Sequence, residues 1–314
     1  MTQMTQKDAS TAVAALGQSV PRQKGPRVFL DMDQQELDDA YTQINFAPNQ
    51  PQIVARYASN SADMRARFGE PRRLAYGAAP IEQFDLYFAR SADAPICVFF
   101  HGGAWRTGDA KTHAFAAEMF VGAGIHFASV DFDNVLGTNG DLMPIADQVR
   151  RATAWVYKNA AGVGVNPRRL YVAGHSSGAH LAAVVLTTDW VNSFALPPDI
   201  IRGGLLSSGM YDLHPVRLSA RSDYVRFTDA VVEALSPQRR VDRLTCPVVV
   251  SHGTLESPEF QRQARDFVAA AKAAGKSAEL LVAEGYNHFE ILETLANPYG
   301  FLGRAALKMM NTGR

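Results

Sequence analysis

The sequence predicts an α/β protein with a mostly parallel central sheet and helices on both of its faces. Short runs that are apolar on both faces recur along the chain. Helical patterns separate them, most clearly over residues 142–156 and 260–271, where apolar residues follow three- and four-residue spacing. Strands buried on both sides that alternate with amphipathic helices are typical of parallel sheets between two helical layers. The apolar runs are PICVFF (95–100), IHFASVD (125–131), LYVAGH (170–175), IRGGLLSSG (201–209), PVVVSH (247–252) and AELLVA (278–283).

The N-terminal part of the chain has a different character. Residues 1–27 are polar apart from the short stretch AVAAL, and we expect a flexible tail there. ELDDAY (36–41) and QIVARYASNSADMRARF (52–68) have helical patterns. We therefore expect residues 28–75 to form a helical cap or entrance segment of a single domain that spans residues 28–314.

One strand pattern stands apart from the doubly apolar runs. In QFDLYFA (83–89), Phe84, Leu86 and Phe88 alternate with other residues at a period of two. Such alternation predicts a strand with one solvated face, and we expect it at an edge of the sheet.

Composition narrows the classes of partner. The 314-residue chain has 31 basic and 31 acidic residues, which gives no indication of nucleic acid or an anionic membrane as partner. Its two cysteines, Cys97 and Cys246, lie in apolar strand-like runs and are expected to be buried thiols. No Cys/His spacing typical of a metal site occurs, and no metal or organic cofactor is expected. Neither a secretory apolar core nor a membrane-length apolar stretch is present, so we expect a cytoplasmic protein.

The strongest chemical signal is Gly174-His175-Ser176-Ser177-Gly178, which matches G-x-S-x-G. A strand-like run precedes it and a helical run follows, as in the sharp strand-to-helix turns that present a reactive serine. Glycines are needed on both sides because a side chain there would collide with neighbouring chain. We predict Ser176 as a nucleophile, the N–H of Ser177 as a donor to the substrate oxygen, and a structural role for His175. The alternative is a glycine-rich turn that only packs a helix onto the sheet.

The second signal, His101-Gly102-Gly103-Ala104-Trp105, directly follows the run PICVFF. Glycines allow backbone N–H groups to approach the oxyanion of a tetrahedral intermediate closely. We predict that Gly102, Gly103 and Ala104 form an oxyanion hole together with Ser177. Trp105 is then expected to wall the acyl side of the pocket. A simple turn after a strand is the alternative.

A general base and an acid complete the expected constellation. His288, in GYNHFE, follows the last strand-like run and fits the chain order serine, acid, histidine. His252 is its rival but precedes the expected acid. For the acid, GTLESPEF offers Glu256 first and Glu259 second, with Asp212 as a third candidate on an earlier loop. We predict that His288 takes the serine proton and that Glu256 orients the histidine.

These motifs resemble the arylformamidase (kynurenine formamidase) branch of the α/β-hydrolases, which neighbours the hormone-sensitive-lipase-like esterases. The resemblance covers residues 30–310 and rests on HGGAW, GHSSGAH, SSGMYDL, ESPEFQRQ and GYNHFE in this order, with LDDAYTQINFAPN and LAYGAAPIEQFDLYFA before them. It implies the α/β-hydrolase fold, a triad of Ser176, Glu256 and His288, and hydrolysis of a small acyl group from an aromatic amide or ester. N-formylkynurenine is the substrate of the family. Glu256 departs from the aspartate of the animal members.

The nature of the substrate stays open at this level. A general carboxylesterase or another aryl-amide or carbamate hydrolase uses the same triad, and a non-catalytic binding protein on this fold is a third reading. We expect Trp105, Phe132, Asn134 and Trp190 to line the pocket for a small-molecule substrate, because of their loop positions. The sequence also leaves a homodimer open.

Overall fold

A computed structural model describes residues 22–91 and 93–310 of the chain, and all elements named below lie in these ranges. In this part, eight strands form a central sheet with the order β10-β9-β8-β7-β5-β6-β4-β3. Only β4 pairs antiparallel with its neighbours, and every other pair of this sheet is parallel. The strands are β3 (Arg72–Ala75), β4 (Gln83–Tyr87), β5 (Ile96–Phe100), β6 (His126–Val130), β7 (Leu170–His175), β8 (Ile201–Ser207), β9 (Val248–Gly253) and β10 (Ala278–Ala283); β1 (Arg27–Phe29) and β2 (Met32–Asp33) form a separate pair.

Helices lie on both faces of the sheet, so the predicted α/β class and mostly parallel sheet are confirmed. The α-helices are α1 (Gln34–Ala40), α2 (Gln50–Phe68), α3 (Ala117–Gly122), α4 (Met143–Val163), α5 (Ser177–Leu186), α6 (Trp190–Phe194), α7 (Leu213–Arg217), α8 (Asp229–Ala234), α9 (Pro258–Ala273), α10 (Glu290–Glu293) and α11 (Phe301–Met309). The 3-10 helices are η1 (Gln43–Phe46), η2 (Ala114–Ala116), η3 (Pro167–Arg169), η4 (Ala220–Asp223), η5 (Pro237–Arg243) and η6 (Thr294–Ala296).

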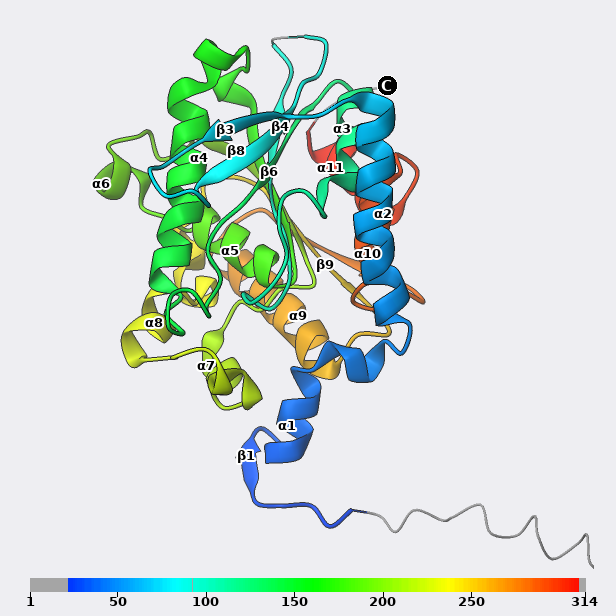
Figure 1. Cartoon of the computed structure of the whole chain (residues 1–314). Coiled ribbons are helices and arrows are strands. Elements are labelled where there is room, and N and C mark those ends of the chain that lie inside the picture. Colours follow the sequence, from blue (N-terminus) through cyan, green and yellow to red (C-terminus); the bar gives the residue numbers. More distant parts are fainter. Residues whose placement is uncertain (1–21, 92, 311–314) are drawn as a thin grey trace, which may run out of the picture.

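Alternating side chains of the strands build two separate cores. Along β5, Val98 and Phe100 pack with residues of α4, α5 and α9 on one face. Cys97 and Phe99 point to the other face and pack with residues of α2, α3 and α11. Figure 1 shows α4 and α2 on opposite sides of the sheet. Full burial of one such side chain contributes about 1.5–3 kcal/mol, and the strands are therefore held from both sides.

The edge of the sheet is β3 rather than β4. β4 lies between β6 and β3, and its residues 84–87 are buried. Asp85, which the alternation assigned to solvent, is buried and accepts a hydrogen bond from Arg73 Nη1 at 2.8 Å. The expected edge position and solvated face of this strand were wrong. β3 pairs with β4 on its outer side, and Arg73 of β3 covers Asp85.

The N-terminal segment begins outside the sheet and returns over the ends of its strands. Asp33 starts α1 with a capping box: its side chain accepts from the N–H of Glu36 at 3.0 Å, while Glu36 accepts from the N–H of Asp33 at 2.9 Å. Of the expected tail, residues 1–21 lie outside the described residues. Its last part is anchored, since Arg22 Nη2 and the N–H of Gly25 donate to Asp33 at 2.8 and 2.6 Å.

Candidate active site

Ser176 lies on the sharp turn between β7 and α5. Its φ of 57° and ψ of −125° are unusual for a residue with a side chain, and such backbone conformations cost on the order of 1–3 kcal/mol. A Cβ atom on Gly174 would collide with the carbonyl oxygen of Gly178, and one on Gly178 would collide with that of Phe100. The two glycines of the motif therefore let the helix pack closely enough to hold Ser176 in this conformation.

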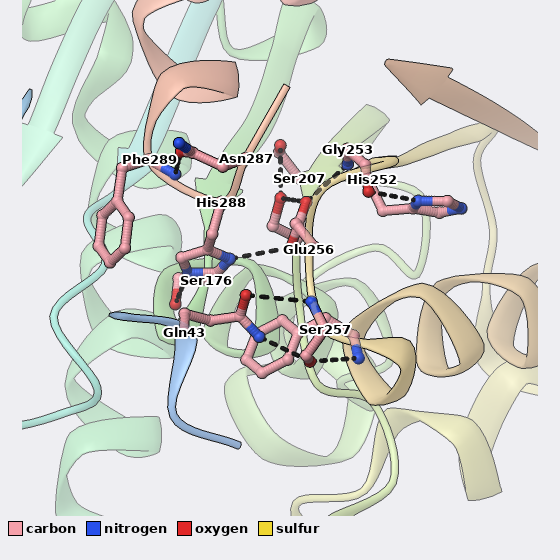
Figure 2. Close-up of polar contacts among 12 residues, drawn as sticks. Gln43, Ser176, Ser207, His252, Gly253, Glu256, Ser257, Asn287, His288 and Phe289 are labelled. Carbon is pink, nitrogen blue, oxygen red and sulfur yellow. Dashed lines mark hydrogen bonds and ion pairs between the residues drawn. The ribbon is translucent and has the colours of Figure 1, made fainter. Parts of the chain in front are cut away.

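Ser176, His288 and Glu256 are joined by hydrogen bonds in a row (Figure 2). His288 Nε2 lies 2.9 Å from Ser176 Oγ, and His288 Nδ1 lies 2.9 Å from Glu256 Oε2. All three side chains are buried. Because a carboxylate only accepts hydrogen bonds, Nδ1 carries the proton and Nε2 is free to accept the serine proton. The geometry is suited to nucleophilic catalysis by serine.

The second oxygen of Glu256 is also held. Glu256 Oε1 accepts hydrogen bonds from Ser208 Oγ at 2.7 Å and from the N–H of Gly253 at 2.6 Å. A buried carboxylate requires such donors, since it has left water. Ser208 was missed in the sequence. Its place directly after the strand run IRGGLLS, at the same end of the sheet as Ser176, is the signal that could have found it.

His175 supports the base from its backbone side. Its Nε2 lies 2.7 Å from the carbonyl oxygen of His288, and the two rings are 4.8 Å apart. Burial, together with the neighbouring His288, lowers the pKa of His175 well below its ordinary value. His175 is therefore neutral and donates to that carbonyl through Nε2. On the other side of His288, Asn287 Oδ1 accepts from the N–H groups of Phe289 and Glu290 at 3.0 Å each, which begins α10.

The loop of Gly102, Gly103 and Ala104 lies against Ser176. A Cβ atom on Gly102 would lie 3.2 Å from Ser176 Cβ, and Gly103 has a φ of 120°, where a side chain would also collide with the Thr107 carbonyl. Within the described residues, the N–H groups of Gly103 and Ala104 have no hydrogen-bond acceptor. The N–H of Ser177 opens α5, where the first N–H groups of a helix have no partner inside it. These groups can receive a developing oxyanion.

The loop of Gly102, Gly103 and Ala104 lines a cavity of about 850 Å³ together with Ser176 and His288. Its walls come from distant parts of the chain: the N-terminal segment, the loop after β5, η4 and the loop after β10. The sequence predicted an entrance segment over residues 28–75, but it did not identify the individual side chains of the walls. Those used below are Tyr41, Gln43, Ile44, Val54, Tyr57, Arg106, His113, Arg221, Asp223, Tyr224 and Phe289.

The four residues expected to line the pocket do not line this cavity, and the expectation is corrected here. Trp105 is 2% exposed and directs its indole N–H to His180 Nδ1 at 3.3 Å. Phe132 lies behind His101, with ring centroids 4.3 Å apart. Trp190 is buried against Phe194, 5.2 Å away. Asn134 accepts from the N–H groups of Leu136 and Gly137 and closes an exposed turn.

The rival candidates for base and acid lie apart from Ser176. His252 Nδ1 contacts the carbonyl of Gly253 at 3.1 Å. Glu259 stands in the first turn of α9 and accepts from Tyr41 Oη at 2.8 Å. Asp212 caps α7 by accepting from the N–H of His214 at 3.0 Å. Each of these groups has a local structural partner.

Two further properties concern the described ranges as a whole. No helix in residues 22–91 and 93–310 is both long and apolar enough to cross a membrane. In the same ranges, no group of three or more His, Cys, Asp or Glu side chains is arranged to hold a metal ion.

The sequence of this chain matches a protein family and is similar to named relatives. The family model BD-FAE matches residues 84–196. The chain is 32% identical to the kynurenine formamidase of Danio rerio over 242 residues, which cover 75% of this chain and 80% of that relative. The kynurenine formamidase of Salmo salar is also 32% identical, over 243 residues and with the same coverage.

Solved structures agree on the fold. A candidate thioesterase from Silicibacter sp. TM1040 has a TM-score of 0.75 and 26% identity and covers 86% of this chain and 98% of its own. An esterase of Pyrobaculum calidifontis has a TM-score of 0.67 and 19% identity and covers 88% of this chain and 97% of its own.

Proposed function

This chain belongs to the kynurenine formamidase family of α/β-hydrolases, and from this premise we propose that it is an arylformamidase that hydrolyses N-formylkynurenine. One observation carries the proposal: Ser176 and His288, in a hydrogen-bonded row with Glu256, line a cavity beside N–H groups that have no acceptor among the described residues. Its volume of about 850 Å³ falls within the range of roughly 300–1,000 Å³ for small-molecule sites. Tyr57, Tyr224 and Phe289 add aromatic surface to its walls, which suits an aromatic leaving group.

In the proposed mechanism, Ser176 Oγ attacks the formyl carbon while His288 Nε2 takes its proton. The carbonyl oxygen becomes an oxyanion and is stabilised by the N–H groups of Gly103, Ala104 and Ser177. His288 then returns the proton to the aniline nitrogen as the C–N bond breaks, leaving a formyl ester on Ser176. Water, deprotonated by His288, attacks this ester, and formate is released as His288 returns the proton to Ser176 Oγ. Glu256 holds the tautomer of His288 throughout.

A general carboxylesterase is the second candidate function. Ile44 and Val54 are exposed at 49% and 40% and line the cavity, which offers an apolar entrance to an ester. Among the relatives, the isoprenylcysteine α-carbonyl methylesterase of Arabidopsis thaliana is 27% identical over 244 residues and is covered over 56% of its length.

The test compares kcat/KM for N-formylkynurenine with that for p-nitrophenyl acetate and butyrate. We expect a much higher value for the formamide and loss of all three activities in Ser176→Ala. Turnover of the esters alone would exclude the arylformamidase and leave the carboxylesterase. Activity that persists in Ser176→Ala would exclude Ser176 as nucleophile.

We also propose a cytoplasmic location. Cys97 and Cys246 are both free and at least partly buried, and unpaired thiols are typical of reducing compartments. Fractionation of cells that express the protein at its natural level tests this, and recovery outside the cytoplasmic fraction would contradict it.

A further inference from the structure

Two arginine side chains at the cavity lie close together without a carboxylate between them. Arg106 and Arg221 both line the cavity. Within residues 22–91 and 93–310, neither of them forms an ion pair with an acidic side chain. Two guanidinium groups without a counter-ion mark a place where an anion binds favourably.

Tyr224 is the platform that brings both groups to the same place. The Arg106 guanidinium lies over the Tyr224 ring, with Cζ 4.1 Å from the ring centroid. Stacking in this way leaves the N–H groups at the edge of the guanidinium available. Arg221 Nη1 donates to the hydroxyl of the same tyrosine at 2.5 Å, and its Nη2 donates to the carbonyl of Tyr41 at 2.7 Å. Arg221 is thus fixed by two of its five N–H groups and keeps three for a ligand.

Among the described residues, the carboxylates that line the same cavity form no ion pair with either arginine. Asp38 Oδ1 accepts from the N–H of Ala220 at 2.6 Å, and Asp109 Oδ1 accepts from the N–H of Thr112 at 2.6 Å. Asp223 is exposed and, among the described residues, has no side-chain partner. The cavity therefore offers an unpaired carboxylate close in sequence to Arg221. It presents positive charge from the two arginines and negative charge from Asp223.

We propose that Arg106 and Arg221 bind the carboxylate of an α-amino acid group on the leaving group of the substrate, with Asp223 as the partner of its ammonium. This inference rests on the proposed function, because it concerns the same cavity, and it names the residues that select the substrate. It predicts that the enzyme prefers zwitterionic aryl substrates over neutral ones of the same shape. Ser176 and its partners perform the bond cleavage in either case.

The test uses acetate esters, so that it does not depend on formamide hydrolysis. Three phenols provide matched leaving groups: 2-methylphenol is neutral, 3-(2-hydroxyphenyl)propanoate is anionic, and ortho-tyrosine is zwitterionic. For the wild type we expect kcat/KM to rise from the first ester to the third, by about 10-fold or more overall. Because both arginines are partly exposed, this preference should shrink at high salt.

Substitutions then assign the preference to residues. In Arg106→Gln and Arg221→Gln, the ratio of kcat/KM between the ortho-tyrosine and 2-methylphenol esters should fall about 3-fold in each variant. Asp223→Asn should lower the ratio between the ortho-tyrosine and propanoate esters about 3-fold. Tyr224→Phe keeps the ring beneath Arg106 and should lose less of the preference than Tyr224→Leu. Arg90→Gln is the matched control, because Arg90 is exposed and lies outside the cavity.

The outcomes separate the two proposals. No preference in the wild type, or a ratio in the arginine variants that changes no more than in Arg90→Gln, would overturn the amino-acid subsite. A clear preference among the esters in an enzyme that does not cleave N-formylkynurenine would remove the arylformamidase and keep the subsite.

Discussion

The loops that follow β5, β7 and β10 line one side of the cavity and the N-terminal segment of residues 22–68 lines another, and different interactions hold the two regions. On the sheet side, backbone sterics dominate: Gly174 and Gly178 allow contacts that no other residue permits, and Ser176 is held at a positive φ. The N-terminal segment instead reaches the site through side-chain hydrogen bonds between residues more than 200 positions apart. Backbone sterics leave a motif in the sequence, whereas single long-range hydrogen bonds do not.

Gln43 illustrates the second kind of contact. Its Nε2 donates to Ser257 Oγ at 2.8 Å, and the Ser257 hydroxyl donates to the Ala40 carbonyl at 2.5 Å (Figure 2 shows Gln43 beside Ser257). Ser257 directly follows Glu256, so the N-terminal segment fixes the loop that carries the proposed acid. Tyr57 makes a similar contact on the histidine side, where its hydroxyl donates to the carbonyl of Phe289 at 2.5 Å.

The largest effect on activity is expected for Ser176→Ala. This change removes the hydroxyl that the strained turn between β7 and α5 holds in place. We expect kcat to fall roughly 10⁴- to 10⁶-fold, while the thermal midpoint changes little. Steady-state kinetics with N-formylkynurenine and an aryl acetate measure this. Ser193→Ala, an exposed position on α6 away from the cavity, should keep wild-type activity.

Glu256 and Glu259 allow a direct comparison, because both are buried carboxylates on one loop and helix start. Glu256→Gln should lower kcat roughly 10²- to 10⁴-fold, since an amide at this position no longer fixes the tautomer of His288. Glu259→Gln disturbs Tyr41 and Arg262 instead and should lower the free energy of unfolding by about 1–3 kcal/mol. Urea unfolding and kinetics on both variants distinguish the roles, and equal losses of kcat would contradict the distinction.

Gln43→Leu tests how strongly the N-terminal segment acts on the loop of Glu256. Loss of its bond to the Ser257 hydroxyl should lower kcat about 10-fold, because this loop then loses one anchor worth about 1 kcal/mol or more. KM should change less than kcat. Gln35→Leu, an exposed glutamine on the outer side of α1, is the control. Unchanged kcat in Gln43→Leu would mean that the sheet side alone positions Glu256.

The smallest effect concerns pH and belongs to the sheet side, which carries buried histidines. Desolvation lowers the pKa of half-buried His113 to about 3, with nearby His101 adding to this shift, and burial lowers the pKa of His180 to about 4. Both values lie below the unfolded value of about 6.5. As pH falls below 6.5, the unfolded chain takes up protons that these histidines in the folded state do not, so stability decreases. We expect each of these two histidines to lower the free energy of unfolding by about 1 kcal/mol as pH falls from 6.5 to 5.5.

Urea unfolding at pH 7.0 and 5.5 measures this loss, and His180→Gln should reduce the difference between the two values. The N-terminal segment of residues 22–68 contains no histidine and adds nothing to this slope. Equal stability at both pH values would show that the buried histidines titrate normally.

The sequence by itself determined the α/β class, the doubly buried strands and the order of the motifs at their ends. These features follow from short-range physics: the two-residue period of strands, the 3.6-residue period of helices and the steric need for glycine. It also singled out Ser176, Glu256 and His288, which the structure brings together, because strand ends of a parallel sheet meet at one edge.

Only the tertiary structure decided which side chains surround the reacting groups. Trp105 and Phe132 follow strand ends as expected of pocket residues, yet both turn into the interior, toward His180 and His101. The walls come instead from side chains such as those of Tyr57 and Tyr224. The sequence predicted an entrance segment that contains Tyr57, but not which of its side chains reach the cavity. The physical reason is that a loop side chain is directed by packing against remote elements, and this packing exists only once the whole chain has folded.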